Sequence, residues 1–316
     1  NRAISGTYAP GSTFKMVVAT AALETGTITT KTQINDTGLY PRGYHPACWY
    51  YTQYHYGHGY LNIKQAIQKS CNYFFYELGY RMGIDPVIEY AKKFGLGNKT
   101  GIELSGEEDG IVELKDYCKE VTGVDWQFGD TLSAVIGQSY NSYTPIQMAR
   151  YISMIANGGK QIDVTLIKAI TDSEGNQISK EKIEQTVNSK LGIDNSTTVK
   201  SLDVKEETLA TIRKGMKGVT SEYGGTAYYI FSDFGMDIAG KTGSAETGQD
   251  NKVNGWFTGF APYDDPEIAV VVLIENAGSG GNTAPTAKEI MQAYFGMNAK
   301  KVTEDVTAIP STQTAR

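Results

Sequence analysis

The chain has 316 residues, of which 40% are hydrophobic and 20% are charged. It carries 29 Lys and Arg against 35 Asp and Glu, so its formal net charge is −6 at pH 7. This acidic balance argues against a nucleic-acid-binding protein, which would concentrate Lys and Arg on one face. The apolar content supports one large domain over residues 1–300 with a polar tail over 301–316. The longest wholly apolar run, 268–274, is far shorter than the roughly 20 residues that span a bilayer.

Turn and capping signals predict helices in the first two thirds of the chain. The Pro10-Gly11 turn precedes an apolar stretch over 13–23, which predicts a buried helix. Asp85-Pro86 and Thr144-Pro145 are N-cap and N1 signals. Further helices are predicted over 62–68, 73–81, 85–94, 144–156 and 206–219. The Ser-, Asn-, Lys- and Glu-rich segment 171–204 predicts a surface excursion.

The last third of the chain changes character. Three short β-rich runs cover 237–246, 255–263 and 267–276, and Asp264-Asp265-Pro266 between the last two is a hairpin turn signal. A terminal helix is predicted from Ala284 to about residue 295. Helices first, strands late and a helix last predict an α+β fold, in which an antiparallel sheet is flanked by helices.

Ser12-Thr13-Phe14-Lys15 stands where the Pro10-Gly11 turn enters the buried helix. Residues three apart share a helix face, so the Ser12 hydroxyl and the Lys15 amine are expected to project together. Burial disfavours a charged amine, which leaves a neutral base for the serine proton. A second Ser-x-x-Lys, Ser179 to Lys182, lies in the polar excursion, where nothing desolvates the lysine; it is interpreted as surface.

Two further short motifs carry suitable chemistry. Ser70-Cys71-Asn72 supplies a hydroxyl for proton relay and an amide for substrate, although Ser139-Tyr140-Asn141 has the same pattern. Lys241-Thr242-Gly243-Ser244 lies in a predicted strand, where alternation points Lys241 and Gly243 to one face and the two hydroxyls to the other. A cation with two hydroxyls suits a carboxylate, and a glycine allows close approach of another backbone.

In this order the three motifs resemble the signature of the penicillin-binding transpeptidases, S-x-x-K, S-D-N and K-T-G, with Cys71 at the middle position. The Ile136-Gly137-Gln138 segment followed by 143–149 is similar to the family's Gly-Gln and Thr-Pro-x-Gln-x-Ala elements. Residues 1–3, 8–15 and 58–76 resemble class B members, elongation-type ones in particular. The resemblance covers nearly the whole chain and implies the penicillin-binding and serine β-lactamase-like transpeptidase fold, with a helical lobe.

The resemblance also implies a role for each matching residue. Ser12 would be the acyl acceptor and Lys15 its base, with backbone N–H groups of Ser12 and Ser244 forming the oxyanion hole. Ser70 would relay a proton to the leaving D-Ala amine, and Asn72 would bind the donor peptide amide. The residues expected to bind the terminal carboxylate and shape its site are Lys241, Thr242, Gly243 and Ser244.

The implied activity is D,D-transpeptidation of peptidoglycan stem peptides, with β-lactams acylating the same serine and no cofactor needed for catalysis. The implied location is the extracytoplasmic face of a bacterial membrane, with a membrane glycan polymerase of the SEDS family as a partner and no nucleic acid. The family's membrane anchor and pedestal domain would precede Asn1.

Three alternatives remain open at this point. A class A serine β-lactamase needs a Glu-x-x-Leu-Asn segment, and only Glu113-Leu114-Lys115-Asp116 stands there; class D enzymes and penicillin sensors have Val where Asn72 stands. A D,D-carboxypeptidase differs only in using water to resolve the acyl-enzyme. A non-enzymatic sensor or scaffold for a glycan polymerase would show a broken motif, and none is broken.

A second cluster of chemistry lies between Asp36 and Cys71. It holds all three histidines and two of the three cysteines, together with one aspartate: Asp36, His45, Cys48, His55, His58 and Cys71. Thiolate, imidazole and carboxylate form the zinc ligand set. A Cys48–Cys71 disulfide, or surface histidines near buried thiols, are the alternatives.

Elongation-type relatives look similar in this segment. On their register the resemblance implies Asp36, Cys48, His58 and Cys71 as ligands of a structural Zn²⁺, with His45 and His55 as alternates. Such an ion would support the Ser70 and Asn72 turn without acting in catalysis. The remaining thiol, Cys118, is expected to be uninvolved. The dense aromatic run over 49–60 could line a peptide groove or pack a loop, and packing is favoured. The aromatic residues over 73–76 and Trp256 are expected to lie in the core.

Overall fold

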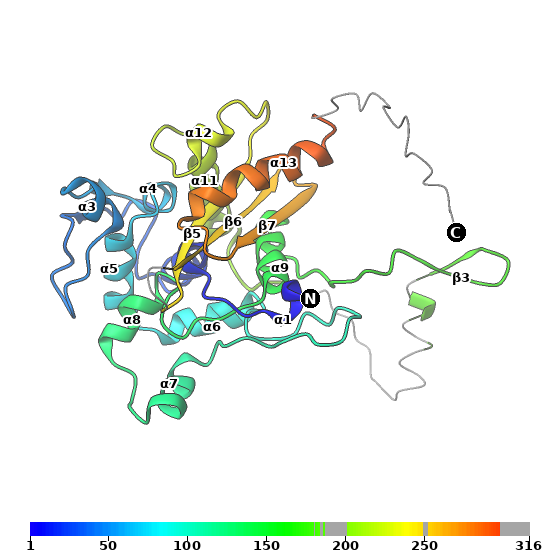
Figure 1. Cartoon of the computed structure of the whole chain (residues 1–316), viewed down its shortest axis with the longest axis horizontal. Coiled ribbons are helices and arrows are strands. Elements are labelled where there is room, and N and C mark those ends of the chain that lie inside the picture. Colours follow the sequence, from blue (N-terminus) through cyan, green and yellow to red (C-terminus); the bar gives the residue numbers. More distant parts are fainter. Residues whose placement is uncertain (180, 184–185, 187–200, 249–251, 298–316) are drawn as a thin grey trace, which may run out of the picture.

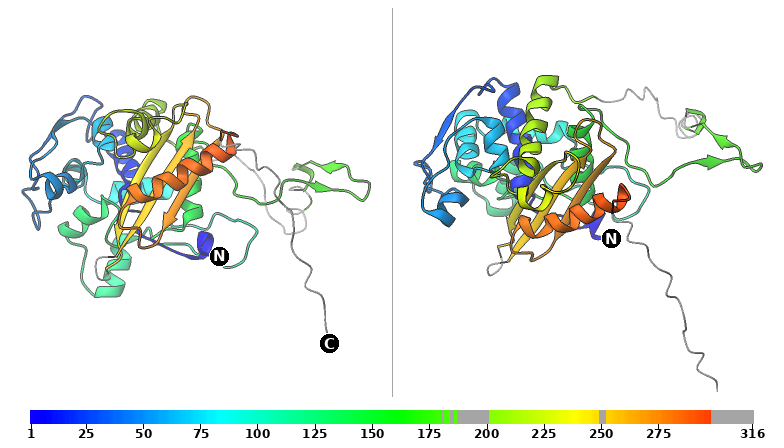
Figure 2. Two further views of the ribbon diagram at one scale, coloured as in Figure 1. Left: turned by 45° about the horizontal axis from the view of Figure 1, so that its top comes forward. Right: turned by 90° about the horizontal axis from the view of Figure 1, so that it is seen from above.

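The computed structural model describes residues 1–179, 181–183, 186, 201–248 and 252–297 (Figure 1). The chain folds as predicted into an α+β domain, with an antiparallel sheet flanked by helices (Figure 2). The predicted tail over 301–316, and part of the predicted surface excursion, lie outside the described residues. None of the helices in the described ranges is long and apolar enough to cross a membrane.

The main sheet has three strands in the order β5-β6-β7, each antiparallel to its neighbour. They are β5 (Ala239–Glu246), β6 (Val253–Ala261) and β7 (Ile268–Ile274), and each lies within two residues of its predicted bounds. The central strand β6 is buried from Gly255 onward because helices cover both faces. Trp256 is fully buried and donates its indole N–H to Ala9 O at 2.9 Å, so its predicted packing role is confirmed.

A buried helix forms the centre of the other layer. The one-turn 3₁₀ helix η1 (Gly11–Phe14) leads into α2 (Lys15–Glu24), whose residues from Lys15 to Ala22 are all buried. Helix α2 packs against α5 (Asn72–Met82), α6 (Asp85–Lys93) and α11 (Glu206–Ser221). The aromatic residues 73–76 of α5 are buried in this core, as predicted.

The remaining long helices close the sheet. Helix α13 (Ala284–Tyr294), which follows the short turn η2 (Gly280–Thr283), packs on β6 and β7 from one side. Helix α9 (Pro145–Ala156) packs on the same strands from the other layer, and α11 packs on β5 and on α4 (Ile63–Gln68) (Figure 2). The helices predicted from capping signals therefore all occur, within about two residues of their expected ends.

Several elements were not predicted, because most are too short to show a periodic pattern and the longest, over 114–122, has no capping side chain or proline to mark its start. They are α1 (Arg2–Ser5), α3 (Trp49–Tyr54), α7 (Leu114–Thr122), α8 (Phe128–Ala134) and α12 (Tyr228–Phe231), with the strand pairs β1 (Ile34–Asp36) with β2 (Gly59–Leu61) and β3 (Ile170–Thr171) with β4 (Gln177–Ile178). The β3-β4 hairpin extends away from the body of the domain (Figure 1).

Candidate active site

The turn that carries Ser12 and Lys15 is built on a glycine. Gly11 has φ +53°, in the left-handed region, and its N–H donates to Gly137 O at 2.9 Å. In the 3₁₀ turn that follows, residues i and i+3 eclipse, so Ser12 and Lys15 share one side as expected. Ser12 remains half-buried at the mouth of the site, whereas Lys15 is fully buried beneath it.

Backbone-to-backbone contacts at four glycines hold this turn in place. A Cβ on Gly11 would lie 2.5 Å from Ser244 O, and one on Gly137 would lie 2.0 Å from Gly11 O. A Cβ on Gly243 would lie 2.9 Å from Pro10 O, and one on Gly280 would lie 2.4 Å from Gly243 O. These distances leave no room for a side chain, so η1 is wedged between strand β5 and the Gly137 loop.

Two lysines converge on one hydroxyl at the base of the site. Lys15 Nζ donates to Ser70 Oγ at 3.3 Å, to Ser70 O at 2.9 Å and to Asn72 Oδ1 at 2.6 Å. Lys241 Nζ donates to the same Ser70 Oγ at 2.8 Å and to Thr242 O at 2.8 Å. The structure thus brings the three sequence motifs together on Ser70, a non-glycine residue with φ +53° at the start of α5.

Burial weakens the charged form of both amines. It lowers the pKa of Lys15 to about 8, while the Cys48 and Cys71 thiol groups act in the opposite direction. Burial, with the nearby Lys15 charge, holds the pKa of Lys241 well below its usual range. Two ammonium groups on one hydroxyl repel each other, so a state with one neutral amine is favoured. That neutral amine is the base that a serine nucleophile requires.

The Ser12 hydroxyl is not yet engaged by this base. Among the hydrogen bonds of the described residues, none joins Ser12 Oγ to Lys15 Nζ. Lys15 instead donates to Ser70 and Asn72. Catalytic hydrogen bonds are often long or absent in substrate-free enzymes and form when substrate binds. The shared side of the 3₁₀ turn keeps the two groups available for that contact.

Strand β5 supplies the opposite wall. The side chain of Lys241 is fully buried toward Ser70, whereas that of Ser244 is exposed, as the predicted alternation requires. Ser244 Oγ accepts the Gly280 N–H at 2.9 Å, and Thr242 Oγ1 lies 2.7 Å from Thr226 Oγ1. The wall therefore offers hydroxyls that are already oriented by neighbours. Sequence analysis missed Thr226, since a lone threonine in a loop carries no signal.

Trp49 is a second residue that sequence analysis did not place at the site. Its indole Nε1 donates to Lys69 O at 3.2 Å and to Ser70 O at 3.0 Å. The Ser70 carbonyl therefore accepts from both Trp49 and Lys15, which orients the turn that carries Ser70 and Asn72. The aromatic content of 49–60 was visible in the sequence, but the carbonyl that this indole reaches was not.

The second Ser-x-x-Lys, which was interpreted as surface, is confirmed as such, because Ser179 and Lys182 are both exposed. In the second Ser-x-Asn, Asn141 is buried, its amide donates to Ala134 O and Gln138 O, and its oxygen accepts from Tyr143. The Asn141 side chain of this copy is thus used within a turn.

The predicted metal ligands converge behind the Ser70 turn. One ligand atom from each of Asp36, Cys48, His58 and Cys71 lies within 4.8 Å of the others. His58 Nδ1 is 2.7 Å from Asp36 Oδ2 and 3.6 Å from Cys48 Sγ, and Cys71 Sγ is 3.3 Å from Asp36 Oδ2. Carboxylate, imidazole and two thiols in this space match the donor set and the spacing of a tetrahedral zinc site.

The electrostatics of the cluster agree with that donor chemistry. A hydrogen bond from Cys71 and one with His58 lower the pKa of Cys48 to about 5, against the effect of burial. Burial raises the pKa of Asp36, but hydrogen bonds from His58, Gly38 and Cys71 outweigh it and bring it to about 2. Burial also raises the pKa of Cys71. The cluster therefore already contains the Cys48 thiolate and the Asp36 carboxylate while the Cys71 thiol is still protonated.

The alternatives considered for this cluster find no support. Cys48 and Cys71 are free thiols whose sulfur atoms lie 4.0 Å apart, about twice the length of a disulfide bond. Neither His45 nor His55 joins a group of possible ligands among the described residues. Cys118 is buried elsewhere, near Thr122 and Val124 O, so its expected separation from the cluster is confirmed.

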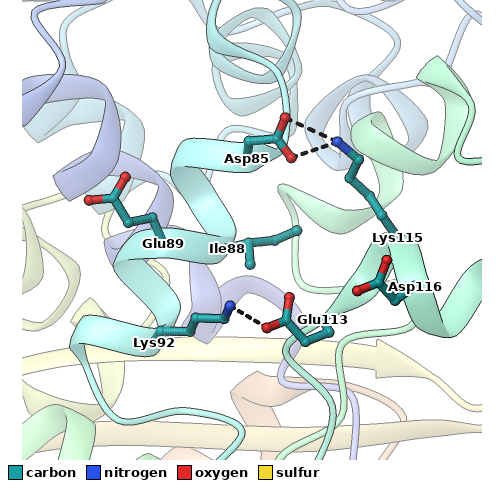
Figure 3. Close-up of a pocket in the computed structure, with 7 residues that line it drawn as sticks. All are labelled: Asp85, Ile88, Glu89, Lys92, Glu113, Lys115 and Asp116. Atoms are coloured by element: carbon teal, nitrogen blue, oxygen red, sulfur yellow. Dashed lines mark hydrogen bonds and ion pairs between the residues drawn. The ribbon is translucent and has the colours of Figure 1, made fainter.

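Two surface pockets of about 360 Å³ lie outside the catalytic cluster. One, between α6 and α7, is lined by seven residues, mostly charged, and Figure 3 shows that Asp85 pairs with Lys115 and Lys92 with Glu113. Paired charges at a solvated surface give this pocket no chemistry. The other lies at the end of β5, beside Ala245, Glu246 and Thr247, with Tyr8 and Tyr140 across from them.

The site combines a serine on a turn, two buried lysines, the Ser70 hydroxyl between them and a strand wall with hydroxyls, which are the groups that a serine acyltransferase uses. Residues 1–292 match the family described as penicillin binding protein transpeptidase domain. The chain belongs to this family, which confirms the predicted resemblance.

Relatives and solved structures agree. The peptidoglycan D,D-transpeptidase MrdA of Haemophilus influenzae is 31% identical over 320 residues, which cover 96% of this chain and 46% of the relative. A Pseudomonas aeruginosa PBP2 structure in complex with WCK 5153 is similar with a TM-score of 0.79 and 31% identity over 93% of this chain and 62% of that one. A structure titled "Structural coordination of polymerization and crosslinking by a peptidoglycan synthase complex" has a TM-score of 0.78 and 29% identity over 95% and 48%. The chain spans about half the length of the curated relatives it matches.

Proposed function

We propose that this chain catalyses D,D-transpeptidation of peptidoglycan stem peptides through an acyl-enzyme on Ser12. The observation that carries the proposal is the convergence of Lys15 and Lys241 on the Ser70 hydroxyl, directly beneath the Ser12 turn. Such an arrangement provides a nucleophile, a neutral base and a relay for a second proton transfer.

In the first half-reaction, Ser12 Oγ attacks the carbonyl of the penultimate D-Ala and Lys15 Nζ takes its proton. Backbone N–H groups of Ser12 and Ser244 hold the oxyanion, where the loss of one donor typically costs about 10²–10³ in rate. The C–N bond then breaks, and Ser70 passes a proton to the departing D-Ala amine. Thr242 and Ser244 bind the terminal carboxylate, and Asn72 binds the donor amide.

In the second half-reaction, an amine on a neighbouring stem peptide attacks the ester on Ser12. The same relay runs in reverse, and Ser12 recovers its proton from Lys15. A β-lactam acylates Ser12 by the first half-reaction and remains attached, because its opened ring retains the leaving group. Water in place of the amine would give a D,D-carboxypeptidase, and rapid hydrolysis of the β-lactam ester would give a β-lactamase.

The substrate determines where in the cell the reaction takes place. Peptidoglycan lies outside the cytoplasmic membrane, so the domain works at the extracytoplasmic face. A membrane glycan polymerase of the SEDS family is the proposed partner, in keeping with the similarity to the solved synthase complex whose title couples polymerization and crosslinking.

The second part of the proposal is a structural Zn²⁺ held by Asp36, Cys48, His58 and Cys71. With these four ligands, the ion would connect the strand pair β1-β2 to the starts of helices α3 and α5. Cys71 directly follows Ser70, and Cys48 directly precedes Trp49, whose indole holds the Ser70 carbonyl. Binding at these four residues would therefore fix the position of Ser70 and Asn72 without contact with the substrate.

The function is tested by incubating the chain with a synthetic donor ending in D-Ala-D-Ala and an acceptor peptide with a free amine. We expect release of D-Ala with formation of a cross-linked product, and no product with Lys15→Ala. Hydrolysed donor without cross-linked product would favour the carboxypeptidase. Hydrolysis of nitrocefin well beyond one equivalent per chain would instead identify a β-lactamase.

A further inference from the structure

Two segments of the chain are rich in tyrosine and free of Lys, Arg, Asp and Glu. They are residues 43–63, which contain Tyr44, Tyr50, Tyr51, Tyr54, Tyr56 and Tyr60, and residues 223–232, which contain Tyr223, Tyr228 and Tyr229. Together they hold nine of the 21 tyrosines of the chain. Surface segments of globular proteins usually carry charges, so this composition calls for an explanation at the surface.

Within each segment the rings form a cluster. Tyr50 lies 4.6 Å from Tyr54 and 5.3 Å from Tyr56 between ring centroids, and its hydroxyl donates to that of Tyr56 at 3.3 Å. In the second segment, Tyr223, Tyr228 and Tyr229 lie 5.3 to 6.4 Å from one another. We call these six residues, Tyr50, Tyr54, Tyr56, Tyr223, Tyr228 and Tyr229, the tyrosine patch.

The two halves of the patch lie on adjoining surfaces. Helix α4, which follows the first segment, is tied to the start of the second by Gln68 Nε2, which donates to Tyr223 O at 3.1 Å, and by the Lys64–Glu222 ion pair at 2.6 Å. Figure 1 shows α3, α4 and α12 on the same side of the molecule.

The rings are exposed far beyond what packing requires. Tyr223 and Tyr229 are 77% and 78% exposed, and Tyr54 and Tyr56 are 45% and 58% exposed. Exposed aromatic rings that lie together and end in hydroxyl groups are typical of a binding surface.

The patch adjoins the carboxylate end of the catalytic site. Thr226, in the middle of the second segment, lies 2.7 Å from the Thr242 hydroxyl. β5 is the first strand in the order of the three-stranded sheet, and a donor peptide along it would have its carboxylate at Thr242 and its scissile carbonyl at Ser244, so that its upstream residues would point toward the pocket at Glu246. The patch therefore lies on the side that the released D-Ala vacates, where the acceptor enters.

We propose that the tyrosine patch binds the glycan of the acceptor strand by stacking pyranose rings on its exposed phenol rings. A pyranose has a face of C–H groups and a rim of hydroxyl and amide groups, which matches an aromatic ring that ends in a hydroxyl. Neither segment contains Lys, Arg, Asp or Glu, and the flanking Lys64 and Glu222 pair with each other, which suits a neutral sugar and disfavours a peptide with carboxylates or a phosphate-rich polymer. This inference rests on the proposed transpeptidase function.

The probe is the β-1,4-linked tetramer of N-acetylglucosamine, which carries no stem peptide, titrated into the 316-residue chain and followed by calorimetry or ligand-observed NMR. We expect saturable binding that weakens about tenfold or more in the double variant Tyr223→Ala with Tyr229→Ala. The matched control is Tyr294→Ala at the C-terminal end of α13, an equally simple loss of a 53%-exposed ring that is not part of the patch, which should bind as the wild type does.

A second pair of variants separates stacking from hydrogen bonding and from unfolding. Tyr223→Phe with Tyr229→Phe keeps both rings and should retain binding within about twofold, and all variants should be labelled normally by a fluorescent penicillin. Absence of saturable binding in the wild type, an equal loss in Tyr294→Ala or in the Phe pair, or parallel loss of penicillin labelling would overturn the proposal. Failure of the wild type to react with penicillin would instead refute the transpeptidase function, whatever the glycan result.

Discussion

The Ser70 hydroxyl accepts hydrogen bonds from two buried lysines and must also have a proton to pass on. Because Lys15 lies 3.3 Å and Lys241 2.8 Å from this oxygen, the charge of one amine affects that of the other. Lys15 takes the Ser12 proton in its neutral form, and burial together with the Lys15 charge favours the neutral form of Lys241 as well. The chemistry at residue scale thus depends on how the two amines share their protons.

This dependence predicts a pH profile for acylation. Burial lowers the pKa of Lys15 to about 8, and only the neutral amine acts as a base. The second-order rate constant for acylation by a β-lactam should therefore rise nearly tenfold per pH unit below the pKa and level off above about pH 8. Stopped-flow measurement over this range checks it, with Lys15→Arg as an inactive control. A flat profile below the pKa would contradict the assignment of Lys15 as base.

Trp49 provides a second prediction at this scale. Trp49→Phe keeps an aromatic ring but removes the N–H that holds the Ser70 carbonyl at 3.0 Å. We expect the acylation step to slow up to about tenfold while initial β-lactam binding is unchanged, since a typical hydrogen bond contributes about 0.5–1.5 kcal/mol.

Tyr50→Phe is the matched control for Trp49, because Tyr50 also packs on His58 but its hydroxyl reaches only Tyr56. It should acylate at the wild-type rate. Equal slowing in both variants, or a change in initial binding alone, would show that Trp49 does not position the turn.

At the scale of elements, the sequence predicted those helices and strands whose signals are local. Thr144 is the N-cap that the sequence predicted, and its side chain accepts from Gln147 N. Asp85 was predicted as an N-cap as well but is the first residue of α6, because its carboxylate pairs with Lys115 and does not cap the helix. The short elements α3 and β1-β2 were not predicted. They are stabilised by tertiary contacts with α5 and with the ligand cluster, and their sequences show no periodic pattern. The same reasoning explains the site: its motifs were predicted, whereas Trp49 and Thr226 act through contacts between distant loops.

The close packing of the glycines predicts a sharp effect at Gly137. A Cβ there would lie 2.0 Å from Gly11 O, so Gly137→Ala must displace the η1 turn that carries Ser12. Gly137 also has φ +75°, so the left-handed penalty adds to this overlap, and we expect a loss of about 2–5 kcal/mol in the free energy of unfolding and slower acylation. Denaturant unfolding and penicillin labelling measure the two effects.

Gly158→Ala is the matched control, since Gly158 has φ +80° but open space around its Cβ position. It should cost only the left-handed backbone penalty, about 1–2 kcal/mol, and leave acylation unchanged. If Gly137→Ala acylates as fast as Gly158→Ala, the η1 turn is not held by this contact.

At the scale of the whole molecule, the ligand cluster links the loop over 36–60 to the catalytic turn. Without a metal, Asp36, His58 and the two cysteines hold each other by hydrogen bonds alone. His58 Nε2 is buried without a partner among the described residues, and the ring contacts Asp36 and Cys48 through Nδ1. Loss of an ion from this cluster should therefore lower the free energy of unfolding and change the position of Ser70.

Metal analysis and chelation check this expectation. Purified protein should contain about one zinc per chain, and a chelator should lower Tm and slow acylation, because binding free energy is then lost from the folded state. His58→Ala should reproduce the effect of the chelator and His45→Ala should not. Zinc below about 0.2 per chain, with no change of Tm in chelator, would contradict the proposed structural zinc site.

The most direct test of the central claim is the mass-spectrometric mapping of a β-lactam adduct on the protein. We expect one equivalent of adduct, located on the peptide that carries Ser12, and no adduct in Ser12→Ala. Ser179→Ala, in the exposed second copy of the motif, should be modified as the wild type is. An adduct that persists in Ser12→Ala, or that maps to any other serine, would contradict the acyl-enzyme on which the proposed function rests.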